Sequence, residues 1–188
     1  MFSPNGMPKQ NPMQTTLKTP LGLARIEGDA QGVSRISITD ETPSGKHSAA
    51  EKASSPNPSP EAQQVASKAP QELQEAVLQL QEYFDGLRTE FSFKMAPRGT
   101  DFQKRVWQQL QKIPYGQTLS YLDLAKELGD VKAIRAVASA NGKNPLWIVV
   151  PCHRVIGTDG SLTGYAGGLW RKKWLLEHEN PPNQTSLF

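Results

Sequence analysis

The chain contains a single cysteine, and the residue types around it favour nucleophilic chemistry. Cys152 follows the apolar run 147–150, which predicts a short buried strand, and His153 and Arg154 come directly after it. An imidazole beside a thiol can take up its proton and leave a thiolate, the form of cysteine that attacks carbon. The alternative is a structural cysteine, because free cysteines are among the most buried residues in proteins.

The composition indicates an intracellular chain without a membrane or metal partner. One cysteine and the lack of an apolar signal-peptide segment in residues 1–14 predict a cytoplasmic location. No stretch approaches the roughly 18 to 20 apolar residues that a bilayer span requires. The histidines at 47, 153 and 178 are scattered and have no cysteine partners at ligand spacing, so we expect no metal site.

Charge is distributed unevenly between the two halves of the chain. The whole chain carries +3, but residues 1–96 carry −2 and residues 97–188 carry +5. The C-terminal half is therefore the better candidate for contacts with phosphate groups.

The N-terminal half reads as strands followed by a helix. Short runs at 14–19, 23–27 and 33–38 predict an antiparallel meander, the last of them by strict alternation of apolar and polar residues. Apolar residues at helical spacing predict a helix over 71–84, and Phe91–Phe93 is a candidate last strand. Between these elements, Pro, Ser and Ala make up 17 of the 29 residues of 42–70, which predicts a disordered insertion.

The C-terminal half reads as a series of helices. Thr100 and Gln103 fit a capping box for a helix that ends at 114–116, and Ser120 is the expected cap of a helix over 121–128. A tight turn at 129–130 leads to a further helix over 131–140, closed by Asn141 and Gly142. Two helices joined by a glycine-containing turn predict a helix-turn-helix, although an ordinary helical hairpin has the same pattern.

Several motifs, in order and at matching spacing, resemble the methylated-DNA–protein-cysteine methyltransferases, the O6-alkylguanine DNA repair family. The resemblance covers residues 97–180. Its motifs are Ile113–Gly116, Ser120–Tyr121, Ala133–Val137, Asn141–Pro145, Pro151–Gly157, Gly164–Gly168 and Trp174–Glu179.

The resemblance implies an α+β fold of two lobes. We expect a small N-terminal α+β lobe, an antiparallel sheet plus a helix of ribonuclease-H-like type, over 1–96, with the disordered insertion at about 42–70. The expected DNA-binding and alkyltransferase domain, 97–180, is mainly helical, with the helix-turn-helix and a short strand bearing Cys152. Residues 181–188 form a tail.

The resemblance also implies DNA repair by direct, stoichiometric and irreversible transfer of an alkyl group to Cys152. The donor would be O6-alkylguanine, or O4-alkylthymine, in double-stranded DNA, and each molecule would act once. No cofactor is expected, and the protein would be a monomer in the cytoplasm, nucleoid-associated if bacterial. Activation of the thiol would run from Glu179 through His153 and a bound water to Cys152.

The remaining site residues are carried over from the family by position. Tyr121 would supply a proton to the departing guanine or steady its phosphate, and the amide of Asn144 would position the sulfur. Arg135 would fill the place of the flipped base, because small neighbours let its helix approach the minor groove closely. The expected DNA contacts are Ser120, Tyr121, Ala133, Arg135 and Ala136, and the expected base pocket is Tyr165, Val155, Ala166 and Gly167.

Two other functions remain open at this point. One is an alkyltransferase-like binder that recognises alkylated DNA without repairing it, although relatives of that kind replace the reactive cysteine. The other is a helix-turn-helix regulator with an incidental thiol.

Overall fold

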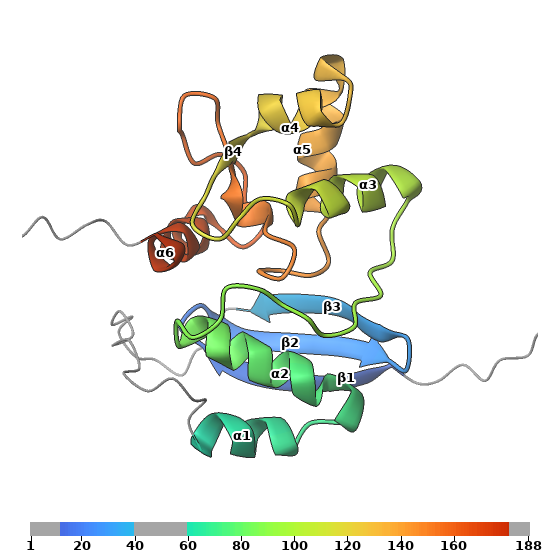
Figure 1. Cartoon of the computed structure of the whole chain (residues 1–188), viewed down its shortest axis with the longest axis vertical. Coiled ribbons are helices and arrows are strands. Elements are labelled where there is room, and N and C mark those ends of the chain that lie inside the picture. Colours follow the sequence, from blue (N-terminus) through green and yellow to red (C-terminus); the bar gives the residue numbers. More distant parts are fainter. Residues whose placement is uncertain (1–11, 40–59, 181–188) are drawn as a thin grey trace, which may run out of the picture.

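The computed structural model describes residues 12–39 and 60–180. Three strands and two helices form a lower lobe in Figure 1, and the remaining elements form an upper lobe. The lower elements are β1 (Met13–Thr19), β2 (Gly22–Asp29), β3 (Gly32–Thr39), α1 (Pro60–Ser67) and α2 (Gln71–Phe84). The upper elements are α3 (Asp101–Leu110), β4 (Leu119–Ser120), α4 (Tyr121–Glu127), η1 (Val131–Ala133), α5 (Ile134–Gly142), η2 (Cys152–Arg154), β5 (Val155–Ile156) and α6 (Leu169–Glu179).

The lower lobe is the predicted antiparallel meander with a helix on one face. The sheet order is β1-β2-β3, and Ile26 of the central strand pairs with Ile36 of β3. Alternate residues of β2 are buried, as expected for a strand with one face on a core. Helix α2 covers that face (Figure 1), with Leu73 and Leu80 fully buried. The α+β fold class and these four predicted elements are confirmed.

The helices of the upper lobe begin at the residues that the capping signals predict. The Thr100 side chain accepts from the backbone of Gln103, and the Gln103 side chain accepts from the backbone of Thr100, which completes the capping box. Ser120 caps α4 by accepting from the backbone of Asp123. The predicted helix over 131–140 differs at both ends: it starts as the 3₁₀ turn η1, and α5 continues to Gly142.

The two lobes meet along the free edge of β3. Ile36 donates from its backbone to Pro145 (2.8 Å) and accepts from the backbone of Trp147 (3.3 Å). Val33 makes a similar bridge to Met95, in the segment that leads from α2 to the upper lobe. The segment that leads to Cys152 is therefore anchored on the sheet, and the buried apolar side chains form one cluster across both lobes. The division at 96–97 stays a prediction.

The apolar run 147–150 is not a strand, which corrects the sequence analysis. After Leu146 the chain turns, with hydrogen bonds from Val149 to Trp147 and from Val150 to Leu146. Ile148 has φ 71°, a left-handed conformation that β-branched residues rarely adopt. The run is apolar because it is buried. Four residues are too few for their periodicity to separate a strand from a buried turn.

Two predictions for the lower lobe were also wrong. Phe91–Phe93 is irregular, and only Met95 of this segment bridges to the sheet. The end of the supposed disordered insertion is ordered: α1 occupies Pro60–Ser67, and Ala66 and Ala69 are buried. Burial against neighbouring elements offsets the ordering entropy of this stretch. The rest of the predicted insertion, 42–59, and the tail after 180 lie outside the described residues.

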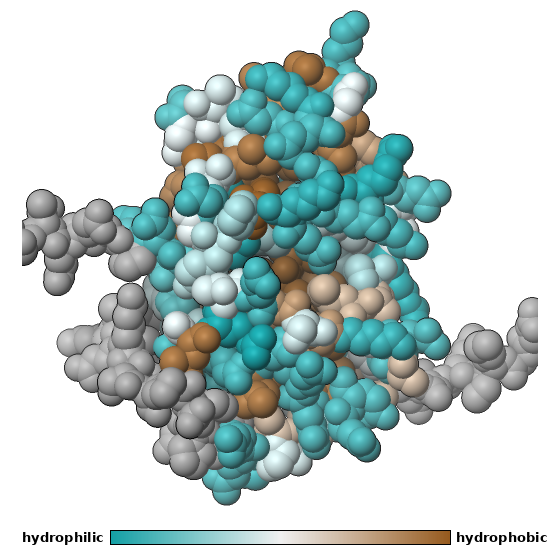
Figure 2. All heavy atoms as spheres, in the orientation of Figure 1, coloured by the Kyte–Doolittle hydropathy of each residue, from teal (hydrophilic) through white to brown (hydrophobic). Residues whose placement is uncertain are grey.

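The surface is mixed in polarity. In the view of Figure 2, hydrophilic and hydrophobic residues alternate over both lobes. The exposed large apolar side chains of the described part are Val65, Val131 and, next to each other at the start of α6, Leu169 and Trp170. Among the described residues, no helix is long and apolar enough to cross a membrane.

Candidate active site

Cys152 opens the 3₁₀ turn η2 and is almost fully buried, with 4% of its surface exposed. The expectation of a strand bearing this cysteine was wrong. The strand β5 starts only at Val155 and pairs in parallel with β4. Side chains that follow each other in a 3₁₀ turn diverge by roughly 120°. Cys152 and His153 therefore point in different directions because they lie in a 3₁₀ turn, and not because they alternate along a strand.

Asn144 holds both the sulfur and the turn that precedes it. Its amide nitrogen lies 3.2 Å from Sγ of Cys152 and 2.7 Å from the carbonyl oxygen of Val150. Its amide oxygen accepts from the backbone of Leu146 at 2.9 Å. One buried amide thus bridges the end of α5, the left-handed turn at Ile148 and the thiol. The family resemblance assigns the Asn144 amide the positioning of the sulfur, and that role stays a prediction.

The carboxylate of Glu179, at the end of α6, is a second centre of the site. Its Oε1 accepts from His153 Nε2 and from Tyr83 Oη, both at 2.8 Å. Its Oε2 accepts from the backbone of Gly116 at 3.2 Å. Burial alone would raise the pKa of Glu179, but the hydrogen bonds from His153 and Arg154 outweigh it and hold the pKa well below its ordinary value. The group is a buried carboxylate and not a solvated helix end.

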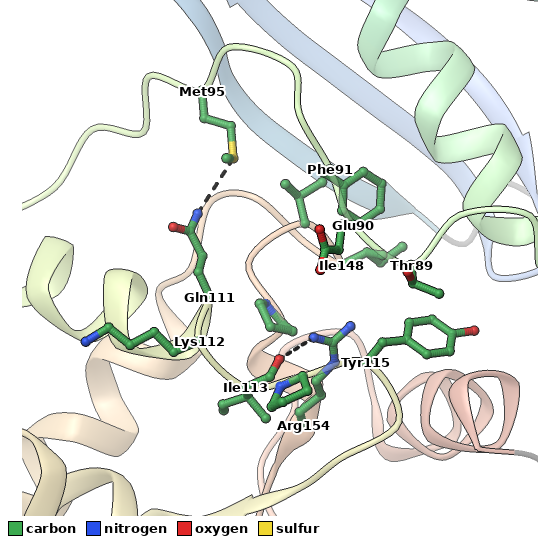
Figure 3. Close-up of a pocket in the computed structure, with 13 residues that line it drawn as sticks. Thr89, Glu90, Phe91, Met95, Gln111, Lys112, Ile113, Tyr115, Ile148 and Arg154 are labelled. Atoms are coloured by element: carbon green, nitrogen blue, oxygen red, sulfur yellow. Dashed lines mark hydrogen bonds between the residues drawn. The ribbon is translucent and has the colours of Figure 1, made fainter.

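Arg154 compensates the charge of this carboxylate. Its Nε and Nη2 donate to Oε2 and Oε1 of Glu179 at 2.7 and 2.9 Å, a two-point pair. Its Nη1 donates to the carbonyl oxygen of Ile113 at 2.6 Å, which Figure 3 shows as a dashed line. Arg154 belongs to the sequence motif around Cys152, but the motif alone assigns it no role. An arginine is rarely buried unless it is paired with an acidic group. Its burial could therefore be predicted only by knowing that Glu179 is its partner, which the sequence alone does not reveal.

His153 is fully buried and is arranged to act as a base. Because its Nε2 faces a carboxylate, the proton of the neutral imidazole resides there, and Nδ1 carries the free lone pair. Within the described residues, Nδ1 has no hydrogen-bond partner. Burial lowers the pKa of His153 against the opposing effect of Glu179, so the imidazole is neutral at rest.

Lys172 is fully buried and is a residue that the sequence analysis missed. Its Nζ donates to the carbonyl oxygens of Val155 (2.6 Å) and Thr163 (2.8 Å) and lies 5.7 Å from the ring centre of Tyr121. Burial lowers the pKa of Lys172 to about 8, against an opposing effect of Cys152. At positions 172, 175 and 179, Lys172, Leu175 and Glu179 lie on one face of α6. This helical spacing could have indicated from the sequence that Lys172 faces the site.

The thiol itself does not ionise easily. Burial raises the pKa of Cys152, while the hydrogen bond from Asn144 and the charge of Lys172 oppose this effect without reversing it. A thiol in such surroundings needs a proton acceptor before it can attack. The neutral imidazole that follows it in the chain is the candidate acceptor.

Tyr121 stands at the start of α4 and is half-buried. Its hydroxyl accepts from the side-chain amide of Asn141 at 3.4 Å, and the same amide lies 3.4 Å from the carbonyl oxygen of Cys152. Asn141 therefore links the tyrosine to the cysteine backbone, a role that the sequence analysis did not assign. Burial, and then the charge of an ionised Cys152, raise the pKa of Tyr121.

The loop between β5 and α6 contains the rest of the expected base pocket. Tyr165 has a buried hydroxyl, and burial together with the charge of an ionised Cys152 raises its pKa well above the ordinary value. The rings of Tyr165 and Trp147 lie 5.3 Å apart. Trp147 also covers Gly167, where an added Cβ would come within 2.2 Å of the indole. Val155 is fully buried, and Ala166 is exposed.

The predicted DNA contacts lie on the helix-turn-helix. Arg135 and Ala136 on α5 are exposed, and Ala133 at the end of η1 is half-buried. The hydroxyl of Ser120 is occupied by its own helix, because it accepts from the backbone of Asp123 and donates to that side chain at 2.7 Å. A contact of Ser120 with DNA stays a prediction, as do the other contacts.

A separate cavity of about 440 Å³ lies between the lobes behind the motif that contains Cys152. Figure 3 shows it between the segment with Phe91 and Met95 and the segment with Gln111 and Tyr115. Arg154 lines it, but Cys152 does not. The described residues contain no group of acidic, histidine or cysteine side chains that could hold a metal ion.

A buried thiol, a neutral imidazole and a carboxylate below a helix-turn-helix define a cysteine-based group-transfer protein. Residues 101–181 match the sequence model of the family "6-O-methylguanine DNA methyltransferase, DNA binding domain". A constitutive methylated-DNA–protein-cysteine methyltransferase of Bacillus subtilis is 43% identical over 154 residues, which are 81% of this chain and 86% of the relative. A methylated-DNA–protein-cysteine methyltransferase of Mycolicibacterium paratuberculosis is 55% identical over 115 residues, which are 60% of this chain and 70% of the relative.

Solved structures agree. A crystal structure of the Mycobacterium tuberculosis O6-methylguanine methyltransferase superposes with TM-score 0.70 at 38% identity and covers 90% of this chain and 93% of its own. A structure of the M. tuberculosis protein in complex with DNA gives 0.68 at 41% identity, covering 87% and 90%. The chain belongs to the methylated-DNA–protein-cysteine methyltransferase family, and the resemblance in its sequence is confirmed.

Proposed function

We propose that this protein repairs DNA by transferring an alkyl group from O6 of guanine to Sγ of Cys152. The observation that carries the proposal is the arrangement around one sulfur. Asn144 fixes it, a neutral buried imidazole follows it in the chain, and a carboxylate orients that imidazole. The relatives named above carry this activity in their names.

Activation begins with a proton leaving the thiol. The base is Nδ1 of His153, reached through a bound water, because a buried ring nitrogen without a protein partner is suited to hold one. The imidazolium that forms is stabilised by Glu179, whose carboxylate stays ionised. The ammonium of Lys172 and the amide of Asn144 stabilise the thiolate.

The transfer itself forms one bond and breaks one. The thiolate attacks the alkyl carbon, a C–S bond forms, and the C–O6 bond breaks with its electron pair moving to the guanine. Tyr121 is the proposed donor that compensates this charge; burial raises its pKa, so the phenol is protonated before the reaction. The lesion supplies the alkyl group, so no cofactor takes part. The thioether has no route back to the thiol, so each molecule acts once.

DNA reaches the sulfur by extrusion of the damaged nucleotide, because O6 is not accessible inside a stacked duplex. Arg135 is exposed on α5 among small residues, and we assign it the place vacated by the base. The everted base would lie against Tyr165, Val155, Ala166 and Gly167. Contacts through helix backbone, alanines and one arginine read little sequence, so recognition should depend on the lesion. The substrate lies in cytoplasmic or nucleoid DNA in this proposal, and the protein acts as a monomer.

The two alternative functions explain less of the site. An alkyltransferase-like binder needs no reactive thiol, and a helix-turn-helix regulator needs neither a buried base nor a carboxylate beside it. Both would leave the hydrogen-bonded series from Glu179 to His153 without a purpose.

The experiment is incubation with duplex DNA that contains O6-methylguanine, followed by mass spectrometry of the intact protein and its peptides. We expect one methyl group in exchange for one proton, on the peptide that contains Cys152. The Cys152→Ala variant should gain nothing and still bind the duplex. Tight binding by the wild-type protein without any mass change would favour the binder and overturn the proposal.

A further inference from the structure

The reactive centre is contacted by a side chain of the opposite lobe. Tyr83, in α2 of the lower lobe, is fully buried, and its hydroxyl lies 2.8 Å from Oε1 of Glu179. That oxygen is also the acceptor for Nε2 of His153 at 2.8 Å. A phenol from the N-terminal half of the chain, the imidazole of the site and Nη2 of Arg154 (2.9 Å) thus share one carboxylate oxygen.

The direction of this hydrogen bond follows from chemistry. An ionised carboxylate only accepts, so the Tyr83 hydroxyl is the donor. Burial, followed by the negative charge of Glu179, raises the pKa of Tyr83 well above its ordinary value, so the phenol keeps its proton throughout the working range of pH. The bond withdraws negative charge from the oxygen that faces the imidazole.

A second contact ties the same residue to the same helix. His178, which precedes Glu179, has Nε2 2.8 Å from the carbonyl oxygen of Tyr83, and the two rings lie 5.2 Å apart at 62°. Helix α2 therefore holds the last turn of α6 at two consecutive residues. A tyrosine that merely filled the core would not need an acceptor from the reactive centre.

We infer that Tyr83 is a positioning residue of the alkyl-transfer site, through which the N-terminal lobe fixes Glu179 against His153. The inference rests on the proposed function. It makes the lower lobe a contributor to the chemistry as well as a support for the sheet contact with 145–147. Tyr83 does not touch the reacting atoms and acts only through the carboxylate.

Loss of the hydroxyl should affect rate and pH dependence in a defined direction. With one donor fewer, Glu179 becomes more basic and attracts the imidazolium more strongly, so the pKa of His153 rises. The acid limb of the rate profile should therefore move to higher pH. Without the Tyr83 hydroxyl, Glu179 is also held less firmly against His153. Because hydrogen bonds to charged groups are the strong ones, we expect this loss of positioning to lower the plateau rate of Tyr83→Phe about 10-fold.

The test compares Tyr83→Phe with Tyr115→Phe in the full chain. Tyr115 is a matched control, because its ring packs against Tyr83 but its hydroxyl lies 3.4 Å from a backbone oxygen of His178 and not on the carboxylate. Methyl transfer from duplex DNA and alkylation of Cys152 by iodoacetamide are measured against pH, and duplex affinity is measured separately. The single cysteine of the chain makes the second readout specific.

We expect Tyr83→Phe alone to show the slower plateau and the shifted acid limb, at unchanged duplex affinity. Profiles of Tyr83→Phe that match those of the wild type would overturn the inference while leaving the proposed function intact. Failure of the wild type to transfer at all would instead remove the proposed function.

Should the Phe variant not fold, site-specific 3-fluorotyrosine at position 83 keeps the ring and provides a stronger donor. Its acid limb should move to lower pH, and an unchanged limb would contradict the inference.

Discussion

The side-chain amide of Asn144 lies 3.2 Å from Sγ of Cys152 and holds the carbonyl oxygens of the strained turn in front of it. The sulfur is therefore positioned by the same group that stabilises the left-handed Ile148. Local strain of this kind persists only where surrounding bonds determine it, and it occurs at functional sites. Position of the thiol and stability of its loop should then change together.

Replacing Asn144 by Ala should lower both activity and stability. The backbone groups of Val150 and Leu146 would lose their buried partner, so the free energy of unfolding should fall by about 2 to 3 kcal/mol. Urea denaturation and single-turnover transfer measure the two effects. Lys143→Ala, at the exposed neighbouring position, is the control for stability. An active, fully stable Asn144→Ala protein would refute the positioning role.

Replacing Lys172 by Met should slow transfer by about 10-fold at neutral pH, the equivalent of one pKa unit for the thiol. Below pH 8 the ammonium is present and favours the thiolate; as pH rises through about 8 the charge is lost. The ratio of wild-type to variant rate should thus be largest below pH 8 and decline above it.

Lys173→Met removes an exposed lysine from the adjacent position and should leave the profile unchanged. A ratio for Lys172→Met that does not vary with pH would mean that its charge plays no part.

Replacing Arg135 by Ala should slow repair of duplex DNA far more than reaction with the free alkylated base. The free base needs no extrusion, so only the duplex reaction depends on a side chain that occupies the vacated place. Rates with both substrates provide the measurement, and Arg25→Ala, an exposed arginine on β2, controls for loss of one positive charge. Equal losses on both substrates would contradict the assignment.

Replacing Glu179 by Gln should destabilise the protein most near neutral pH. The pKa of Glu179 is lower in the folded protein than in the unfolded chain. Its contribution to the free energy of unfolding is therefore complete above the ordinary pKa of a carboxyl group and is lost progressively as the pH falls from there towards the folded pKa. Because the variant leaves Arg154 buried without its counter-ion, we expect a loss of about 3 kcal/mol at pH 7. Denaturation at pH 7 and pH 3.5 should show the gap narrowing in acid, and a constant gap would disprove this account.

Much of the fold and part of the site could be predicted from sequence. Strands with period two and helix-capping residues are local signals, and the structure contains the sheet and the helix starts that they predict. The motif around Cys152 identified the family but not the 3₁₀ turn that carries the cysteine. Helix α1 was missed because it is stabilised by the burial of Ala66 and Ala69 against other elements. Composition alone does not predict such tertiary contacts. The run 147–150 was misread because buried turns and buried strands are equally apolar.

The missed residues of the site are polar groups with distant partners. Arg154 and Lys172 look like surface cations until their acceptors are known, and Tyr83 lies 96 residues from the carboxylate that it contacts. The pairing of Tyr83 depends on how the two lobes meet, and those of Arg154 and Lys172 depend on how α6 packs within the upper lobe. A single sequence places each residue on an element but does not bring the elements together.

The indole of Trp147 rests directly on the backbone of Gly167, closer than any Cβ could tolerate. Position 167 is thus tied to one bulky neighbour, because any side chain there requires the indole to move or to be replaced by a smaller group. A designer who wishes to vary position 167 must first replace Trp147 by a smaller residue. A substitution at 167 made before that step would report on the clash with the indole and not on ligand scope.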